Sequence, residues 1–207
     1  YTKSYCPLHP KVHDVVLSIL DELVNVFEAK TLHAGMDEVF YIGNDNCIRC
    51  SGKSKSELYA NEVNLIHSFL KKRNVQLMIW GDRMIDGKET GLGMWEASEN
   101  DTYGSIDLID KDVIVADWHY RKATNTHDYF IEKGFRVLTC PHNNKEVAKT
   151  QYDQYKNHKS ENYLGMVQTI WLTNQEFIDF YNGKIKIESG KKGSLETYKE
   201  LVSLWKK

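Results

Sequence analysis

The feature that most constrains the fold is a repeated alternation between short apolar runs and amphipathic stretches. Five runs are expected to be β-strands, each followed by a connection that is helical or long enough to contain a helix. The expected strands are residues 31–35, 75–80, 113–118, 135–139 and 163–171. They read as continuous apolar runs, which is typical of strands buried on both faces. We therefore predict an α/β fold with a parallel sheet covered by helices.

Helical periodicity marks the connections between these runs. After Pro10, which favours a helix start, apolar side chains recur at helical spacing from Val12 to Phe27. Further helices are expected at residues 56–70, 128–133, 144–155, 176–181 and 195–205. We predict one domain over residues 1–207, and the pattern leaves open whether its sheet is doubly wound or part of a barrel.

Composition narrows the classes of function. The chain has 207 residues, 41% of them hydrophobic, which is enough to bury a core. A net charge of −2 argues against nucleic acid as a partner, and no apolar run is long enough to span a membrane. The start has no signal-peptide pattern. The first residue is not Met and the first residues lead straight into a helix, so we expect the chain to be a fragment of a longer protein.

The cysteines are too few for a disulfide scaffold. They are Cys6, Cys47, Cys50 and Cys140. Cys47 and Cys50 form a lone C-x-x-C, which we interpret as a pair of loop cysteines. A zinc site would need a second pair of ligands, which Cys6, His9 or His13 could supply, although the spacing does not demand it. No metal or cofactor is predicted.

An acidic pair, Asp37 and Glu38, follows the first expected strand. Active sites of parallel α/β folds gather at the carboxyl ends of the strands. The pair lies between an apolar stretch that ends at Met36 and another that begins at Val39, whereas a solvated pair would have polar neighbours. Carboxylates held among apolar residues can have pKa values raised toward neutrality. We therefore predict that this pair performs acid/base chemistry.

Tryptophans lie at the ends of three expected strands: Trp80, Trp118 and Trp171. One of them alone would be interpreted as a core residue, but three at the same edge indicate a binding role. Flat aromatic faces suit the C–H face of a sugar ring. Beside a carboxylate pair, they indicate glycoside hydrolysis, in which a carboxylic acid protonates the leaving oxygen. Trp95, in a connection, is either a lid over this site or a packed loop residue.

Residues 33–38 read His-Ala-Gly-Met-Asp-Glu and resemble the H-x-G-x-D-E signature of glycoside hydrolase family 20, the β-N-acetylhexosaminidases. Residues 75–82 resemble the next strand of that family, and residues 163–171 resemble its last barrel strand. The resemblance implies a (β/α)8 TIM barrel, of which this chain looks like the portion from about strand 4 to strand 8. The barrel's early-strand arginine, which grips the sugar, would lie outside the chain.

The resemblance also implies a mechanism. Glu38 would be the general acid and then the general base, while Asp37 would orient and stabilise the substrate's 2-acetamido group. That group would attack the anomeric carbon and form an oxazolinium intermediate, with retention of configuration. The implied partner is a glycan with a terminal β-linked N-acetylhexosamine, and a bacterial member would be periplasmic or secreted. The implied substrate-binding residues are His33, Trp80, Asp82, Trp118, Tyr120 and Trp171.

Two segments depart from the family pattern. Residues 140–143 read Cys-Pro-His-Asn where many members carry Tyr-x-Asp, and Tyr120 is the hydroxyl that would replace this tyrosine. Thr173 stands where many members have a glutamate two residues after the last tryptophan. The choice between glucosaminide and galactosaminide therefore stays open, as does the oligomeric state.

Three other interpretations compete with this one. A catalytically inactive carbohydrate-binding protein, or an inactive fragment of the same fold, would bind sugar without turnover. A metal-dependent hydrolase built on His33, Asp37 and Glu38 is disfavoured, because the histidines show no H-x-H or H-E-x-x-H spacing. A redox role for Cys47 and Cys50 is disfavoured, because no helix start follows the first cysteine.

Overall fold

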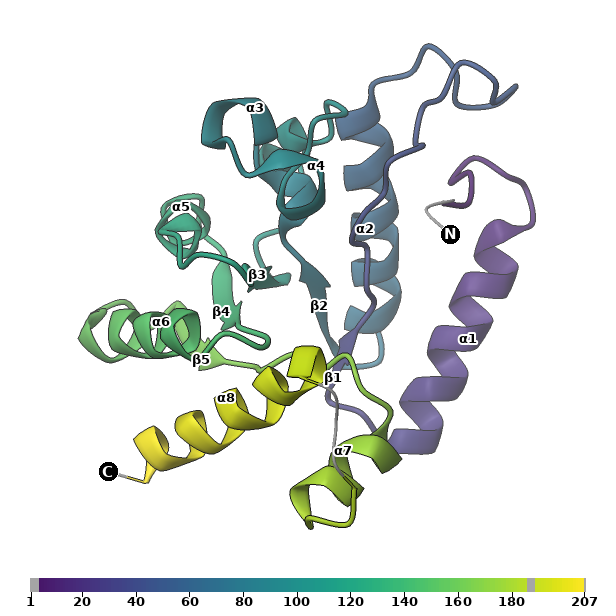
Figure 1. Cartoon of the computed structure of the whole chain (residues 1–207). Helices are drawn as coiled ribbons and strands as arrows, with labels where there is room; N and C mark the ends of the chain where they lie inside the picture. Colours follow the sequence, from purple (N-terminus) through teal and green to yellow (C-terminus); the bar gives the residue numbers. More distant parts are fainter. Residues whose placement is uncertain (1–3, 186–188, 207) are drawn as a thin grey trace.

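A five-stranded parallel sheet forms the centre of the molecule (Figure 1). The computed structural model describes residues 4–185 and 189–206. The strands lie side by side in chain order and every neighbouring pair is parallel. They are β1 (Thr31–His33), β2 (Gln76–Trp80), β3 (Ile114–Trp118), β4 (Arg136–Cys140) and β5 (Tyr163–Met166). The predicted α/β fold with a parallel sheet is confirmed.

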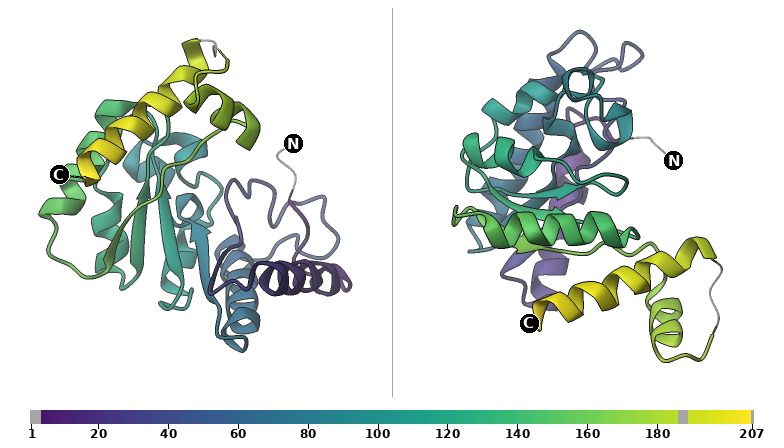
Figure 2. Two further views of the ribbon diagram at one scale, coloured as in Figure 1. Left: turned by 90° about the horizontal axis from the view of Figure 1, so that it is seen from below. Right: turned by 60° about the vertical axis from the view of Figure 1, so that its left-hand side comes forward.

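Helices fill every connection between neighbouring strands. The longer connecting helices are α2 (Lys55–Lys71), α5 (Thr126–Glu132) and α6 (Lys145–Asn157). Before β1 comes α1 (Val12–Phe27), and after β5 come α7 (Asn174–Tyr181) and α8 (Ser189–Trp205). The β2–β3 connection holds only short ones: η1 (Asp82–Met84), α3 (Gly87–Thr90), α4 (Gly93–Glu96) and η2 (Tyr103–Asp107). Figure 2 shows α8 packed along α6, where the Tyr152 hydroxyl donates to the Leu204 carbonyl at 2.9 Å. No described helix is long and apolar enough to cross a membrane.

The main core lies between α2 and one face of the sheet. From α2 come Tyr59, Val63 and Leu70, all without exposed surface, and they share one cluster with Leu77 and Ile79 of β2. Neighbouring residues of β2 alternate between buried and half-buried, so its second face is only partly covered. The expectation that strands are buried on both faces is therefore right for most of β3 and wrong for β2.

Two strands end earlier than expected, for local backbone reasons. β1 ends at His33 because Gly35 and Met36 adopt left-handed backbone angles, with φ of 75° and 72°. β5 ends at Met166 after a register irregularity against β4, and Gly165 has a φ of 137°. The chain beyond β5 still follows β4, because Val167 N–H donates to the Thr139 carbonyl at 3.0 Å.

Candidate active site

The acidic pair lies on a tightly turned loop that follows β1. Gly35, Met36 and Glu38 all have positive φ, the last at 51°. Glycine adopts this region without steric cost, whereas a residue with a Cβ loses about 1–3 kcal/mol there. Such conformations persist only where the surroundings enforce them, and they concentrate at functional sites.

Hydrogen bonds from three elements enforce this conformation. Tyr59 of α2 is fully buried, and its hydroxyl donates to the Met36 carbonyl at 2.8 Å. Trp80 N–H at the end of β2 donates to the Gly35 carbonyl at 3.0 Å. Glu38 N–H donates to Asp82 Oδ2 at 2.9 Å. The loop is therefore tied to the core helix and to the neighbouring strand.

Asp82 organises the floor of the site. Its Oδ2 also accepts from Arg83 Nε at 2.6 Å, and its Oδ1 accepts from the Trp118 indole N–H at 3.2 Å. Only 2% of Asp82 is exposed, and this residue, expected to contact substrate, does not line the pocket. The fully buried Arg83 balances its charge and also donates to the Ala97 carbonyl at 2.6 Å. Asp82 therefore positions Glu38 and Trp118 together.

Above this floor lies a pocket of about 380 Å³. The predicted site residues that line it are Asp37, Glu38, Trp80, Trp118, Tyr120 and Trp171. Residues not assigned to the site from sequence complete the lining: Leu92, Trp95, Glu96 and Arg121. Trp171 is 69% exposed, so its ring is available at the pocket mouth. His33 does not line the pocket, but its ring lies 4.4 Å from that of Trp80.

The position of Trp95 combines features of the two roles that the sequence left open, a lid over the site and a packed loop residue. It lines the pocket and remains 44% exposed. Its ring packs edge-on against Phe40 at 5.3 Å between centroids. Phe40 in turn packs against the Arg83 guanidinium, whose carbon lies 4.9 Å from the ring centre. Trp95 is thus part of the pocket wall and packs against Phe40, on the loop that carries Asp37 and Glu38.

The electrostatics of the pocket favour a protonated carboxyl. Burial raises the pKa of Asp37, and the negative charge of Asp82 raises it further. Burial also raises the pKa of Glu38, followed by the charges of Asp37 and Asp82. The Arg83 guanidinium opposes both shifts. A carboxyl with a raised pKa keeps its proton nearer neutral pH, as a general acid requires.

A buried chain of charges connects the pocket wall to β3. The pocket residue Glu96 lies 2.8 Å from His119 Nδ1, and Asp117 lies 3.1 Å from His119 Nε2. Thr126 of α5 donates to the second Asp117 oxygen at 2.6 Å. Burial alone would lower the pKa of His119, but the two carboxylates raise it to about 9. No spacing in the sequence joins Glu96 to His119, because the tertiary fold brings them together.

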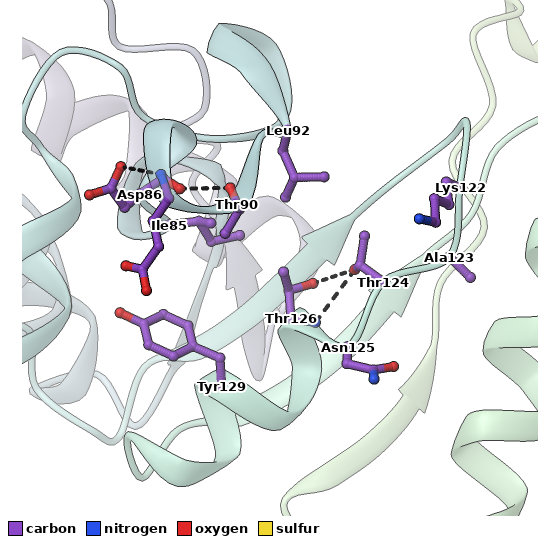
Figure 3. Close-up of a pocket in the computed structure, with 11 residues that line it drawn as sticks. Ile85, Asp86, Thr90, Leu92, Lys122, Ala123, Thr124, Asn125, Thr126 and Tyr129 are labelled. Carbon is purple, nitrogen blue, oxygen red and sulfur yellow. Dashed lines mark hydrogen bonds between the residues drawn. The ribbon is translucent and has the colours of Figure 1, made fainter.

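A larger pocket, of about 650 Å³, adjoins the site and shares Leu92 with it. Figure 3 shows Thr90 and Leu92 on one side of it and Thr126 and Tyr129 on the other. Two carboxylates line it, Asp86 and Glu89, and Asp86 caps α3 by accepting from Lys88 N–H at 2.8 Å. Because the carboxylate pair and the three strand-end tryptophans line the smaller pocket, we take the smaller pocket as the candidate active site.

Active sites of parallel (β/α) barrels lie at the carboxyl ends of the strands, and glycoside hydrolases use carboxyl groups as acids and bases. The sequence comparison specifies the family. Residues 1–190 match the catalytic domain of glycosyl hydrolase family 20, and the chain belongs to that family. Among curated proteins, no sequence matches the chain significantly.

Solved structures with a similar fold include a β-N-acetylhexosaminidase from Bacteroides fragilis NCTC 9343. The TM-score is 0.57 at 13% identity, over 84% of this chain and 38% of that chain. The chain therefore spans less than half of that structure. Dispersin B matches with a TM-score of 0.46 and 14% identity, over 92% of this chain and 60% of that chain. At this identity, the Bacteroides structure establishes the fold alone.

Proposed function

We propose that this chain contributes part of the catalytic (β/α)8 barrel of a glycosidase that removes terminal N-acetylhexosamine from β-linked glycans. In this proposal β1 to β5 are strands 4 to 8 of the barrel. The observation that carries it is the Asp37–Glu38 pair, held on a hydrogen-bonded loop in a pocket walled by strand-end tryptophans. Family membership and the fold of the Bacteroides hexosaminidase support it.

In the first step, the carbonyl oxygen of the substrate's 2-acetamido group attacks the anomeric carbon. The bond from that carbon to the leaving oxygen breaks, and Glu38 gives its proton to the leaving oxygen. Asp37 stabilises the positive charge that the acetamide gains as it becomes an oxazolinium. This order of events uses the substrate's own group as nucleophile, so the enzyme needs no second carboxylate at the anomeric carbon.

In the second step, the Glu38 carboxylate takes a proton from water. The water oxygen bonds to the anomeric carbon, the oxazolinium opens, and the acetamido group is restored. Two displacements at the same carbon retain the configuration. Glu38 returns to its protonated form, in which its raised pKa keeps it ready for the next cycle.

Turnover of an aryl N-acetyl-β-glucosaminide tests this proposal, measured on the chain within its full-length polypeptide. We expect release of the aryl group and of β-configured N-acetylhexosamine, seen by NMR before mutarotation. Equal cleavage of an analogue without the 2-acetamido group would contradict substrate assistance. Binding of N-acetylglucosamine without any turnover would contradict the proposed glycosidase activity.

One observation favours the second candidate, a carbohydrate-binding protein without turnover. Thr173, where many family members have a sugar-contacting glutamate, is the N-cap of α7. Its hydroxyl accepts from Glu176 N–H at 3.2 Å, and the Glu176 carboxylate accepts from Thr173 N–H at 2.8 Å. This capping box occupies both side chains, so the sugar hydroxyls would be held by fewer groups. The turnover measurement separates the two candidates.

A further inference from the structure

Three of the four cysteines converge outside the sugar pocket. Cys6 lies ahead of α1, whereas Cys47 and Cys50 belong to the loop between β1 and α2. The Cys6 and Cys47 sulfurs are 3.4 Å apart, and all three sulfurs lie within 4.8 Å of one another. All three are free thiols. Residues distant in the sequence therefore present three soft ligands to one point.

This spacing suits one tetrahedral metal ion. Zinc binds thiolates at about 2.3 Å, so sulfurs that share a tetrahedral zinc lie roughly 3.8 Å apart. Small movements within the observed 4.8 Å limit would reach that geometry. A disulfide would join only two of these sulfurs and leave the third as an isolated thiol. Among divalent ions, zinc is the one most often held by such thiolate sets.

We propose that Cys6, Cys47 and Cys50 bind a structural zinc ion and that His9 supplies the fourth ligand. Cys6 and His9 are three residues apart, as are Cys47 and Cys50, and two such pairs are the usual ligand pattern of structural zinc sites. His9 N–H donates to the Cys6 carbonyl at 3.0 Å, which closes a tight turn between them.

The contacts of the two nearby histidines distinguish between them. His9 Nδ1 accepts from Lys11 N–H at 3.2 Å, so Nε2 is the nitrogen left to coordinate, and the exposed ring has room to rotate. His13, in contrast, is held 2.8 Å from Glu62 on α2. The Tyr5 hydroxyl donates to the same carboxylate at 2.7 Å, so His13 serves to anchor the N-terminal segment.

The zinc would link the loop that carries Asp37 and Glu38 to the N-terminal segment. No described helix or strand lies between β1 and α2, so residues 34–54 depend on local contacts for their shape. The loop cysteine Cys50 is only 2% exposed and belongs to the main core. On the other side, Tyr5 and Pro7 line a cavity together with Met36 and Asp37. A metal bridge here would limit the motion of the loop that carries Asp37 and Glu38.

Metal analysis of the purified, reduced full chain tests the proposal. After removal of metal with a chelator and addition of zinc alone, we expect one zinc ion per chain. Cobalt(II) in its place should give the intense near-ultraviolet thiolate-to-metal absorption and the visible bands of a tetrahedral site. Removal of zinc should lower the melting temperature, and zinc addition should restore it.

Substitutions identify the ligands. Cys47→Ser and Cys50→Ser should lose stoichiometric zinc and the cobalt spectrum, and His9→Ala should weaken binding. The matched control is Cys140→Ala, since Cys140 is also a free, buried thiol but lies at the end of β4. If the serine variants do not fold, the cobalt spectrum of the unaltered chain still decides.

Two results would overturn the proposal: no stoichiometric zinc in the unaltered, reduced chain, or zinc retained by Cys47→Ser. Unchanged zinc affinity in His9→Ala would overturn the assignment of the fourth ligand. None of these measurements depends on glycosidase activity, so they succeed or fail separately from the proposed function.

Discussion

The backbone N–H of Glu38 donates to the buried carboxylate of Asp82 at 2.9 Å, which joins the loop after β1 to the end of β2. The same carboxylate holds Arg83 and the Trp118 indole. Glu38 and Trp118 belong to different strand ends, so one buried anion sets the position of both. This arrangement makes Asp82 the residue on which the geometry of the pocket most depends.

We expect Asp82→Asn to destabilise the chain strongly. Asp82 and Arg83 form a buried ion pair at 2.6 Å, and the substitution leaves the arginine charge without its partner. Breaking a buried pair in this way typically costs about 3–5 kcal/mol. Urea unfolding followed by circular dichroism measures the change. As a control, Asp21→Asn removes an exposed pair with Arg73 and should cost no more than about 1 kcal/mol. Equal stability of the two variants would contradict the role of Asp82.

Glu38→Gln in the full-length enzyme should remove most activity on substrates with poor leaving groups. General acid catalysis typically contributes about 10²–10⁴-fold. Activated aryl leaving groups need little protonation, so their first step should suffer less. Steady-state rates on an alkyl and a nitrophenyl N-acetylhexosaminide provide the comparison. Equal losses on both would argue against Glu38 as the acid.

Asp37→Asn should lower kcat far more than it raises KM. The Asp37 charge matters most once the acetamide carries positive charge, and interactions made mainly in the transition state act on kcat. A thiazoline analogue of the oxazolinium should bind the unaltered enzyme and lose affinity in this variant. Tight thiazoline binding by Asp37→Asn would refute the assigned role.

Tyr59→Phe should disturb the loop that carries Asp37 and Glu38 without removing either carboxylate. It leaves the Met36 carbonyl without its donor, at a cost of about 1–3 kcal/mol for a buried group. Tyr163→Phe is the matched control, because it removes another buried tyrosine hydroxyl contact, 3.0 Å from Thr139, away from that loop. Both should lower the melting temperature, but only Tyr59→Phe should lower kcat. A loss of kcat in both variants would show a general effect of stability.

The stability of the chain should fall as pH rises through about 9. The folded pKa of His119 is raised to about 9 from an ordinary value of 6.5. A group with a raised folded pKa stabilises the fold fully below its unfolded pKa, and this contribution fades as pH rises through the folded pKa. A difference of this size corresponds to at most about 3 kcal/mol. Urea unfolding at pH 6 and pH 10 measures this change in the free energy of unfolding. The change should be smaller in His119→Gln. An unchanged pH dependence in that variant would contradict the prediction.

Particular elements show how far the sequence predicts this molecule. The parallel sheet follows from five apolar runs and their helical connections, because burial imposes a periodicity that the residues themselves carry. The meeting of the Asp37–Glu38 pair with Trp80, Trp118 and Trp171 in one pocket also follows, since parallel strands align their carboxyl ends at one edge. The exact ends of β1 and β5 do not follow, because they depend on backbone angles at Gly35 and Gly165.

By itself, the sequence determined the class of fold, the edge that carries the site and the residue types that face it. Only the tertiary structure decided that Asp82 is buried outside the pocket lining, that Glu96 reaches His119, and that Cys6 joins Cys47 and Cys50. The physical reason is the distance along the chain over which each property acts. Periodicity and capping are local properties of the chain, whereas a hydrogen bond or a thiol cluster between distant segments exists only where packing brings their backbones together.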